Sequence, residues 1–429
     1  MVDRDPPRAH AKDQPTSAPG RLAPRTVHVL IVCIALVAPA AGVLLTFLEV
    51  FRDGLGGVEG LAGSSAVSVS ATGDQVYATG RLDDALVVFD RDATADALAF
   101  REAFVDGVDG VGGLAGAAGV ASSRELRNIY VASAHSLAVF RRDATADAIA
   151  FSLHLQDGVG GVFGLNGASS VAVSPDDVHV LVTADLDDAL TLFRRDGSSD
   201  ALAFVDVAVD GSGGVFGLGG AADAAFSADG RNVYVAASGD SALAVFRRDA
   251  SVDDLAFLQA HVDAADGVYG LGGAGGVAAS PDGKHVYVTG RSDDSLAVFE
   301  VVSAQGELGF VVAYGDGQPG IDALDGASAV VVSPDGRYVI VAAADEDAVS
   351  IFRRYPEDGT LTQAAVLRDG ENGVDGLDGA IALAVSPSAL HVYVAAEGEN
   401  AISSFRNALI LKLETFEDGS LDAWNRAIP

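Results

Sequence analysis

Cysteine, methionine and tryptophan each occur once in the 429 residues, and the single cysteine is Cys33. One cysteine cannot form an intrachain disulfide, so packing and hydrogen bonds alone must hold the fold. Lysine occurs only at Lys12, Lys284 and Lys412. With 27 Lys+Arg against 60 Asp+Glu the formal net charge is −33, which argues against nucleic acid or an anionic membrane surface as a partner.

The sequence is instead rich in one repeated stretch, Ser280–Phe299 with the sequence SPDGKHVYVTGRSDDSLAVF. The closing phenylalanine recurs seven times, with one step of 51 residues followed by five steps of 53, at Phe89, Phe140, Phe193, Phe246, Phe299, Phe352 and Phe405. A period kept this strictly indicates a repeat architecture in which every unit is one supersecondary block.

One unit, residues 274–326, predicts four short strands. Small and apolar residues at 275–279 precede the turn Ser280-Pro281-Asp282-Gly283, in which proline and glycine fit the backbone angles of a tight turn. Two β-branched or alternating runs, 285–289 and 295–299, then read as strands, and 308–312 as a fourth. No helical pattern appears, so we predict an all-β fold, a seven-bladed β-propeller of four-stranded blades.

The segments SPDGKHVYVTG, SADGRNVYVAA and SPDGRYVIVAA also resemble the YVTN-type repeats of the lactonase-like propellers, the family of bacterial 6-phosphogluconolactonase. The resemblance covers roughly residues 45–405. It implies the same propeller fold, and it implies lactone hydrolysis as one activity to consider. Enzymes of this kind need charged side chains that bind the lactone and polarise its carbonyl group.

The seventh unit stops after its third strand at Phe405, and its fourth strand is expected at the other end of the chain. Leu45-Thr46-Phe47 and the glycine spacing that follows repeat Leu98-Ala99-Phe100 at an offset of 53. We therefore predict that residues 45–52 close the ring by pairing with 401–405, which removes free sheet edges. The alternative is that 409–416 supplies this strand.

The repeat divides the chain into four parts. Residues 1–26 are polar and proline-rich and are predicted to be disordered, and residues 27–40 are predicted to be a signal-peptide core or, alternatively, a membrane anchor. Residues 41–407 form the propeller and 408–429 a C-terminal tail. The signal predicts an extracellular, periplasmic or envelope location, or a membrane-anchored one.

Two loop families are expected to meet on one face of the propeller. They are glycine-rich loops such as Asp106–Gly116 and acidic turns after the second strand of each unit. Carboxylates and glycine carbonyls are oxygen ligands of the kind Ca²⁺ takes, although the same residues can serve as turn formers. The candidate calcium ligands are Asp83, Asp84, Asp187, Asp188, Asp293 and Asp294. No other cofactor is expected.

A catalytic site would need polar residues that break the repeat, and the inner strands offer no His, Arg, Glu or Lys. His179, His285 and His391 share one column, which we interpret as a solvent-facing strand end. The Arg pairs that follow the third strand, such as Arg247-Arg248, are interpreted as local ion pairs or a solvated rim rather than as an anion site. His135 alone lies in a turn of the candidate face.

These observations predict an exported, monomeric propeller that acts as a non-catalytic scaffold for an unknown protein or glycan at the loop face. The alternative is a lactone hydrolase of the 6-phosphogluconolactonase-like family.

Overall fold

The computed structural model describes residues 45–92, 94–143 and 145–407. The predicted disordered segment 1–26, the signal or anchor 27–40, the rival strand 409–416 and the tail 408–429 lie outside these residues, so the expected export stays a prediction. The described residues form strands and turns without a helix. Accordingly, no helix among them is long and apolar enough to span a membrane.

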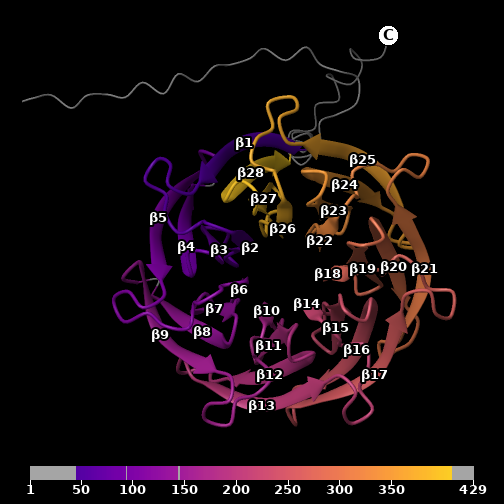
Figure 1. The fold of residues 1–429 in the computed structure, drawn as a ribbon, viewed down its shortest axis with the longest axis horizontal. Coiled ribbons are helices and arrows are strands. Elements are labelled where there is room, and N and C mark those ends of the chain that lie inside the picture. Colours follow the sequence, from indigo (N-terminus) through magenta and orange to yellow (C-terminus); the bar gives the residue numbers. More distant parts are fainter. Residues whose placement is uncertain (1–44, 93, 144, 408–429) are drawn as a thin grey trace, which may run out of the picture. The chain divides into compact units, whose positions relative to one another are not determined.

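Seven four-stranded antiparallel sheets follow one another around a ring, and the first strand of each lies nearest the axis (Figure 1). Blades one to three consist of β2 (Ser64–Val69), β3 (Gln75–Gly80), β4 (Ala85–Asp92) and β5 (Ala97–Val105); β6 (Gly119–Ser122), β7 (Asn128–Ser133), β8 (Ser136–Asp143) and β9 (Ala148–Gln156); and β10 (Ala168–Val173), β11 (His179–Ala184), β12 (Ala189–Arg195) and β13 (Leu202–Val209).

Blades four to six repeat this order. They consist of β14 (Ala221–Phe226), β15 (Asn232–Ala237), β16 (Ala242–Asp249) and β17 (Asp254–Val262); β18 (Ala274–Ala279), β19 (His285–Gly290), β20 (Ser295–Val301) and β21 (Leu308–Gly315); and β22 (Ala327–Val332), β23 (Tyr338–Ala343), β24 (Ala348–Arg354) and β25 (Leu361–Arg368).

Blade seven combines the two ends of the described chain. Its strands are β26 (Ala380–Val385), β27 (His391–Ala396), β28 (Ala401–Asn407) and β1 (Leu45–Arg52), and β1 lies on the outside beside β28. The register runs from Leu45 opposite Asn407 to Arg52 opposite Ala401, with a shift between Phe47 and Glu49. The predicted closure by residues 45–52 is therefore confirmed.

The repeated phenylalanine lies in the hydrophobic core of each blade. All seven of these side chains are fully buried, and most meet a second phenylalanine from the outer strand at an edge-to-face angle. Phe299 and Phe310, for example, have ring centroids 5.5 Å apart. Burial of so much aromatic surface, with a favourable ring geometry, explains why each unit keeps this residue.

The turn between the first and second strands has a local hydrogen-bond network. In blade five the Ser280 hydroxyl donates to the Asp282 carboxylate at 2.5 Å and accepts the His285 amide at 3.0 Å. Gly283 has a φ of +69°, which glycine adopts without steric cost. The motif read as a turn in the sequence thus also aligns the start of the second strand.

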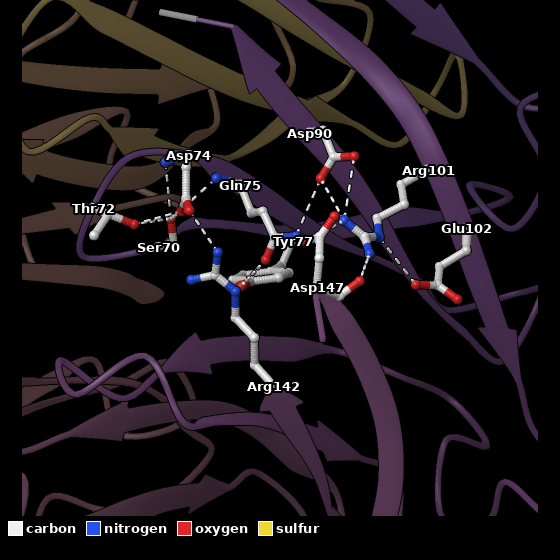
Figure 2. Close-up of polar contacts among 10 residues, drawn as sticks. All are labelled: Ser70, Thr72, Asp74, Gln75, Tyr77, Asp90, Arg101, Glu102, Arg142 and Asp147. Atoms are coloured by element: carbon white, nitrogen blue, oxygen red, sulfur yellow. Dashed lines mark hydrogen bonds and ion pairs between the residues drawn. The ribbon is translucent and has the colours of Figure 1, made fainter. Parts of the chain in front are cut away.

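Arginine side chains on the face opposite the glycine-rich loops join neighbouring blades. Figure 2 shows Arg142 of β8 reaching back to Asp74 in the preceding blade, at 2.5 Å, and Arg101 between Asp90 and Asp147. In later blades the second arginine of each pair is buried, with exposed fractions of 6%, 5% and 3% at Arg195, Arg248 and Arg354. The second arginine of each pair therefore forms an ion pair, as one of the two interpretations expected, and the alternative of a solvated rim is wrong for it.

The histidine column belongs to the same inter-blade network. His179, His285 and His391 are almost fully buried, so their interpretation as a solvent-facing strand end is wrong. Arg248, which comes from the following blade, donates from Nε to Nδ1 of His179 at 2.8 Å. In five of the seven blades the second residue after the repeated phenylalanine is an arginine that contacts polar side chains of the preceding blade. The same position holds Val301 in blade five and Asn407 in blade seven.

Candidate functional site

The inner strands of the blades surround the axis (Figure 1). They line a central channel of about 510 Å³. Its wall consists of apolar residues, glycines and serines, together with one titratable side chain, that of Asp223. The serine hydroxyls of Ser65, Ser169 and Ser328 donate to backbone carbonyls of the next blade at 2.8 to 2.9 Å. These three serine hydroxyls therefore connect neighbouring blades.

Asp223 on β14 is half-buried, and its carboxylate is hydrogen-bonded to three successive blades. Oδ1 accepts the Ser170 hydroxyl at 2.8 Å and the Ala224 amide at 2.9 Å, and Oδ2 accepts the Val277 amide at 3.0 Å. A carboxylate has about four acceptor positions. The structure therefore leaves Oδ2 able to accept a further hydrogen bond from a molecule in the channel.

Burial raises the pKa of the Asp223 carboxyl, and the hydrogen bonds from Val277, Ser170 and Ala224 only partly oppose this effect. A carboxyl whose pKa is raised holds a proton more readily at moderate pH than an exposed aspartate does. This is the direction in which a carboxyl group becomes a better general base near neutral pH.

The sequence prediction missed Asp223, because it considered only His, Arg, Glu and Lys as catalytic groups of the inner strands, although the sequence carries a signal for this aspartate. In the aligned repeats, each of the other six blades has a small residue at the position equivalent to Asp223. The column reads Ala66, Gly119, Ser170, Asp223, Gly276, Ala329 and Ala382. A single carboxylate among small residues is the kind of departure from the repeat that marks a site.

The aspartates predicted as calcium ligands are hydrogen-bonded to the glycine-rich loops. Asp83 accepts the Ala62 amide at 2.9 Å and Asp84 accepts the Gly116 amide of the next loop at 2.7 Å. The other four repeat this pattern, with Asp187 and Asp293 in the place of Asp83, and Asp188 and Asp294 in the place of Asp84. Each turn therefore fixes two loops, and the structure does not gather these six residues at one point.

Other carboxylates of the two predicted loop families do come together, in blades six and seven. Carboxylate oxygens lie within 4.8 Å of one another in two equivalent groups, Asp316–Asp322–Glu346 and Asp369–Asp375–Glu399. An arginine pairs with each group: Arg368 lies 3.0 Å from Asp322 and 2.6 Å from Glu346. These guanidinium groups already provide the positive charge that the carboxylates require.

The other three histidines of the described residues lie away from Asp223 in the fold. His135 is exposed in the turn between β7 and β8 of blade two, as expected. His154 and His261 are on the outer strands β9 and β17, where Nε2 of His261 lies 3.1 Å from the Leu308 carbonyl. None of these three residues lines the central channel.

Comparison with known proteins agrees with this architecture. Residues 220–366, which include Asp223, match the family described as "Lactonase, 7-bladed beta-propeller". The resemblance to lactonase-like propellers is confirmed. No curated protein matches this lactonase-like chain.

Solved structures share the fold of this lactonase-like propeller. A putative 6-phosphogluconolactonase from Bacteroides fragilis is 23% identical with a TM-score of 0.56, over 71% of this chain and 84% of that one. The periplasmic gluconolactonase of Pseudomonas aeruginosa is 23% identical with a TM-score of 0.56, over 71% and 85%. Kuenenia stuttgartiensis hydrazine synthase is 15% identical with a TM-score of 0.59, over 83% and 99%. At these identities the likeness concerns the fold alone.

Proposed function

We propose that this lactonase-like propeller hydrolyses lactones in its central channel, with Asp223 as the general base. The observation that carries the proposal is the single carboxylate in an otherwise uncharged channel, held by hydrogen bonds from three blades. The family match over residues 220–366 supports it, since that stretch contains β14.

The reaction needs only water and the lactone. The Asp223 carboxylate accepts a proton from a water molecule while the water oxygen attacks the lactone carbonyl carbon. The tetrahedral intermediate then breaks its bond to the ring oxygen, which takes the proton back from Asp223. The product is the open-chain hydroxy acid, and the carboxylate is regenerated. Ser170 acts as a positioning residue because its hydroxyl holds Oδ1.

The direct test is a pH-stat assay of the purified full chain with gluconolactone, corrected for spontaneous hydrolysis. Asp223→Ala should remove the catalysed rate while leaving the fold intact, because alanine already occupies this column at Ala66, Ala329 and Ala382. Asp206→Ala, which removes an exposed carboxylate from the outer strand β13, is the control and should keep full activity. A wild-type rate equal to the spontaneous rate, or a fully active Asp223→Ala protein, would refute the proposal.

A second candidate, the non-catalytic scaffold for a protein or glycan, is favoured by one observation. The sixth residue after the leading aspartate of the glycine-rich loop is aromatic in three successive blades. Phe163, Phe216 and Tyr269 are 56%, 50% and 53% exposed, and neighbouring exposed aromatic residues often mark interaction sites. Replacing all three by serine should abolish binding to any partner found on a glycan array, with the lactonase rate unchanged.

A further inference from the structure

We infer that the lactone accepted by this channel carries no anionic group, so that an unphosphorylated sugar lactone is the substrate and its phosphorylated counterpart is excluded. The inference rests on the proposed function, since it concerns the substrate class of the same site. It follows from the distribution of charge around Asp223.

The channel wall offers a phosphate no positive charge. Among the residues that line it, Asp223 is the one charged group, and the others are apolar residues, glycines and serines. The serines at 65, 169 and 328 donate their hydroxyl hydrogens to backbone carbonyls, so they are not free donors to a phosphate. A dianion close to the Asp223 carboxylate would therefore meet repulsion without compensation.

The nearer mouth of the channel is surrounded by the glycine-rich loops, because β14 begins at Ala221, two residues before Asp223. The arginines at this face are already paired with carboxylates. Arg81 lies 2.6 Å from Glu397, and Arg291 lies 3.0 Å from Asp345. Arg52 and Arg368 each pair with two acidic residues. These pairs cancel the positive charge that a phosphate would need.

Carboxylates at the same face also repel one another electrostatically. Burial and the neighbouring Asp294 raise the pKa of Asp325, and burial and the neighbouring Asp347 raise the pKa of Asp378. Like charges close together produce such shifts because each disfavours ionisation of the other. The face through which a substrate approaches Asp223 therefore has a negative electrostatic potential, which opposes the entry of anions.

Positive side chains at the opposite face are either distant from Asp223 or already paired. The guanidinium of Arg248 lies 5.7 Å from the centre of the Phe226 ring, and it already donates to both carboxylate oxygens of Asp176 at 2.9 Å. Lys284, Arg231 and Arg337 lie in turns that follow the far ends of the inner strands. Three strand residues, roughly 10 Å, separate Asp223 from the end of β14 at Phe226. Arg231 and Arg337 also lie 3.8 Å from aspartates of their own turns.

The test compares kcat/KM of the purified full chain for gluconolactone and 6-phosphogluconolactone at low and high salt. At low ionic strength we expect at least a tenfold preference for the unphosphorylated lactone. The preference should shrink in 1 M salt, where the Debye length is about 3 Å, because screening weakens repulsion of the phosphate alone. Equal rates, or a preference for the phosphorylated lactone, would overturn the inference. No catalysis with either lactone would instead refute the proposed function.

A pair of variants at Ile381 tests whether the lack of positive charge in the channel wall causes the preference for the unphosphorylated lactone. Ile381 lines the channel in blade seven and belongs to a wall that lacks positive charge. Ile381→Lys should raise the relative kcat/KM for the phosphorylated lactone about tenfold, whereas Ile381→Met, of similar length, should leave the preference as it is. If the two variants fold equally well by circular dichroism and show the same preference, charge does not select the substrate and the inference fails.

Discussion

Arg52 and Asp375 form a bidentate ion pair although 323 positions separate them in the sequence. Nη1 of Arg52 lies 3.1 Å from Oδ2 of Asp375, and Nη2 lies 2.6 Å from Oδ1. Nη2 also lies 2.8 Å from Glu399. Since Arg52 ends β1, the pair joins the first described strand to the glycine-rich loop that leads into the last blade.

Replacing Arg52 by methionine should lower the melting temperature more than the same change at Arg368. Arg368 makes the equivalent contacts in blade six, but β25 remains covalently linked to β24, whereas β1 is joined to β28 by noncovalent contacts. Loss of a partly exposed pair costs about 1 kcal/mol or less. Thermal unfolding followed by circular dichroism measures both variants, and equal losses would show that closure does not depend on Arg52.

The buried arginines should contribute much more than their exposed neighbours. Arg354 binds both oxygens of Asp282 at 2.8 and 2.9 Å and donates to the Tyr287 hydroxyl at 2.8 Å. Arg354→Met should reduce the free energy of unfolding by about 2 to 3 kcal/mol, because these bonds are made to a charged donor. The adjacent Arg353→Met removes an exposed side chain and should change it by at most about 0.5 kcal/mol. Urea unfolding measures the free energy of unfolding of both variants. Similar losses for the two variants would contradict the stabilising role assigned to the buried Arg354.

The histidine column should make the protein less stable as the pH falls below about 6.5. Burial is the main cause that lowers the pKa of His179, His285 and His391. The second cause is a nearby positive charge, which is Arg248 for His179, Arg354 for His285 and Arg91 for His391. The unfolded chain therefore takes up protons first, below the ordinary histidine pKa of about 6.5, and stability falls from that pH downward. An ordinary carboxyl group has its pKa near 4, below this range.

Replacing all three histidines by asparagine isolates this effect, since Asn128 and Asn232 already occupy the same column. The melting temperature of the wild type should fall between pH 7.5 and 5.5, and that of the triple variant should change much less. His135→Asn, at an exposed turn, is the control and should behave like the wild type. If all three proteins show the same pH dependence, the buried histidines are not its source.

The architecture could be predicted from the sequence because the strands of one propeller blade come from residues that are close together in the chain. The strands, turns and phenylalanine column all fall within one 53-residue period, and the match of Leu45-Thr46-Phe47 to Leu98-Ala99-Phe100 predicted the closing strand. The confirmed resemblance to lactonase-like propellers rests on the same turn and strand residues.

Contacts between blades could not be predicted from the sequence of one repeat. His179 contacts Arg248, which is 69 positions away in the sequence. The alternation of apolar and polar residues within a strand does not show that a neighbouring blade covers the first residue of that strand. The acidic turns were correctly placed beside the glycine-rich loops, but their hydrogen bonds to the Ala62 and Gly116 amides depend on loop geometry. Asp223 was visible only by comparing one column across all seven units.

The most direct test of the central claim is the pH dependence of kcat/KM for gluconolactone in the wild type and in Ser170→Ala. If Asp223 is the general base, the rate should rise with pH through one ionisation whose pKa lies above the ordinary aspartate value. Removing the Ser170 hydroxyl, which stabilises the charged carboxylate, should move that ionisation to higher pH. A profile that is flat after correction for spontaneous hydrolysis, or one that Ser170→Ala leaves in place, would contradict the assignment of Asp223.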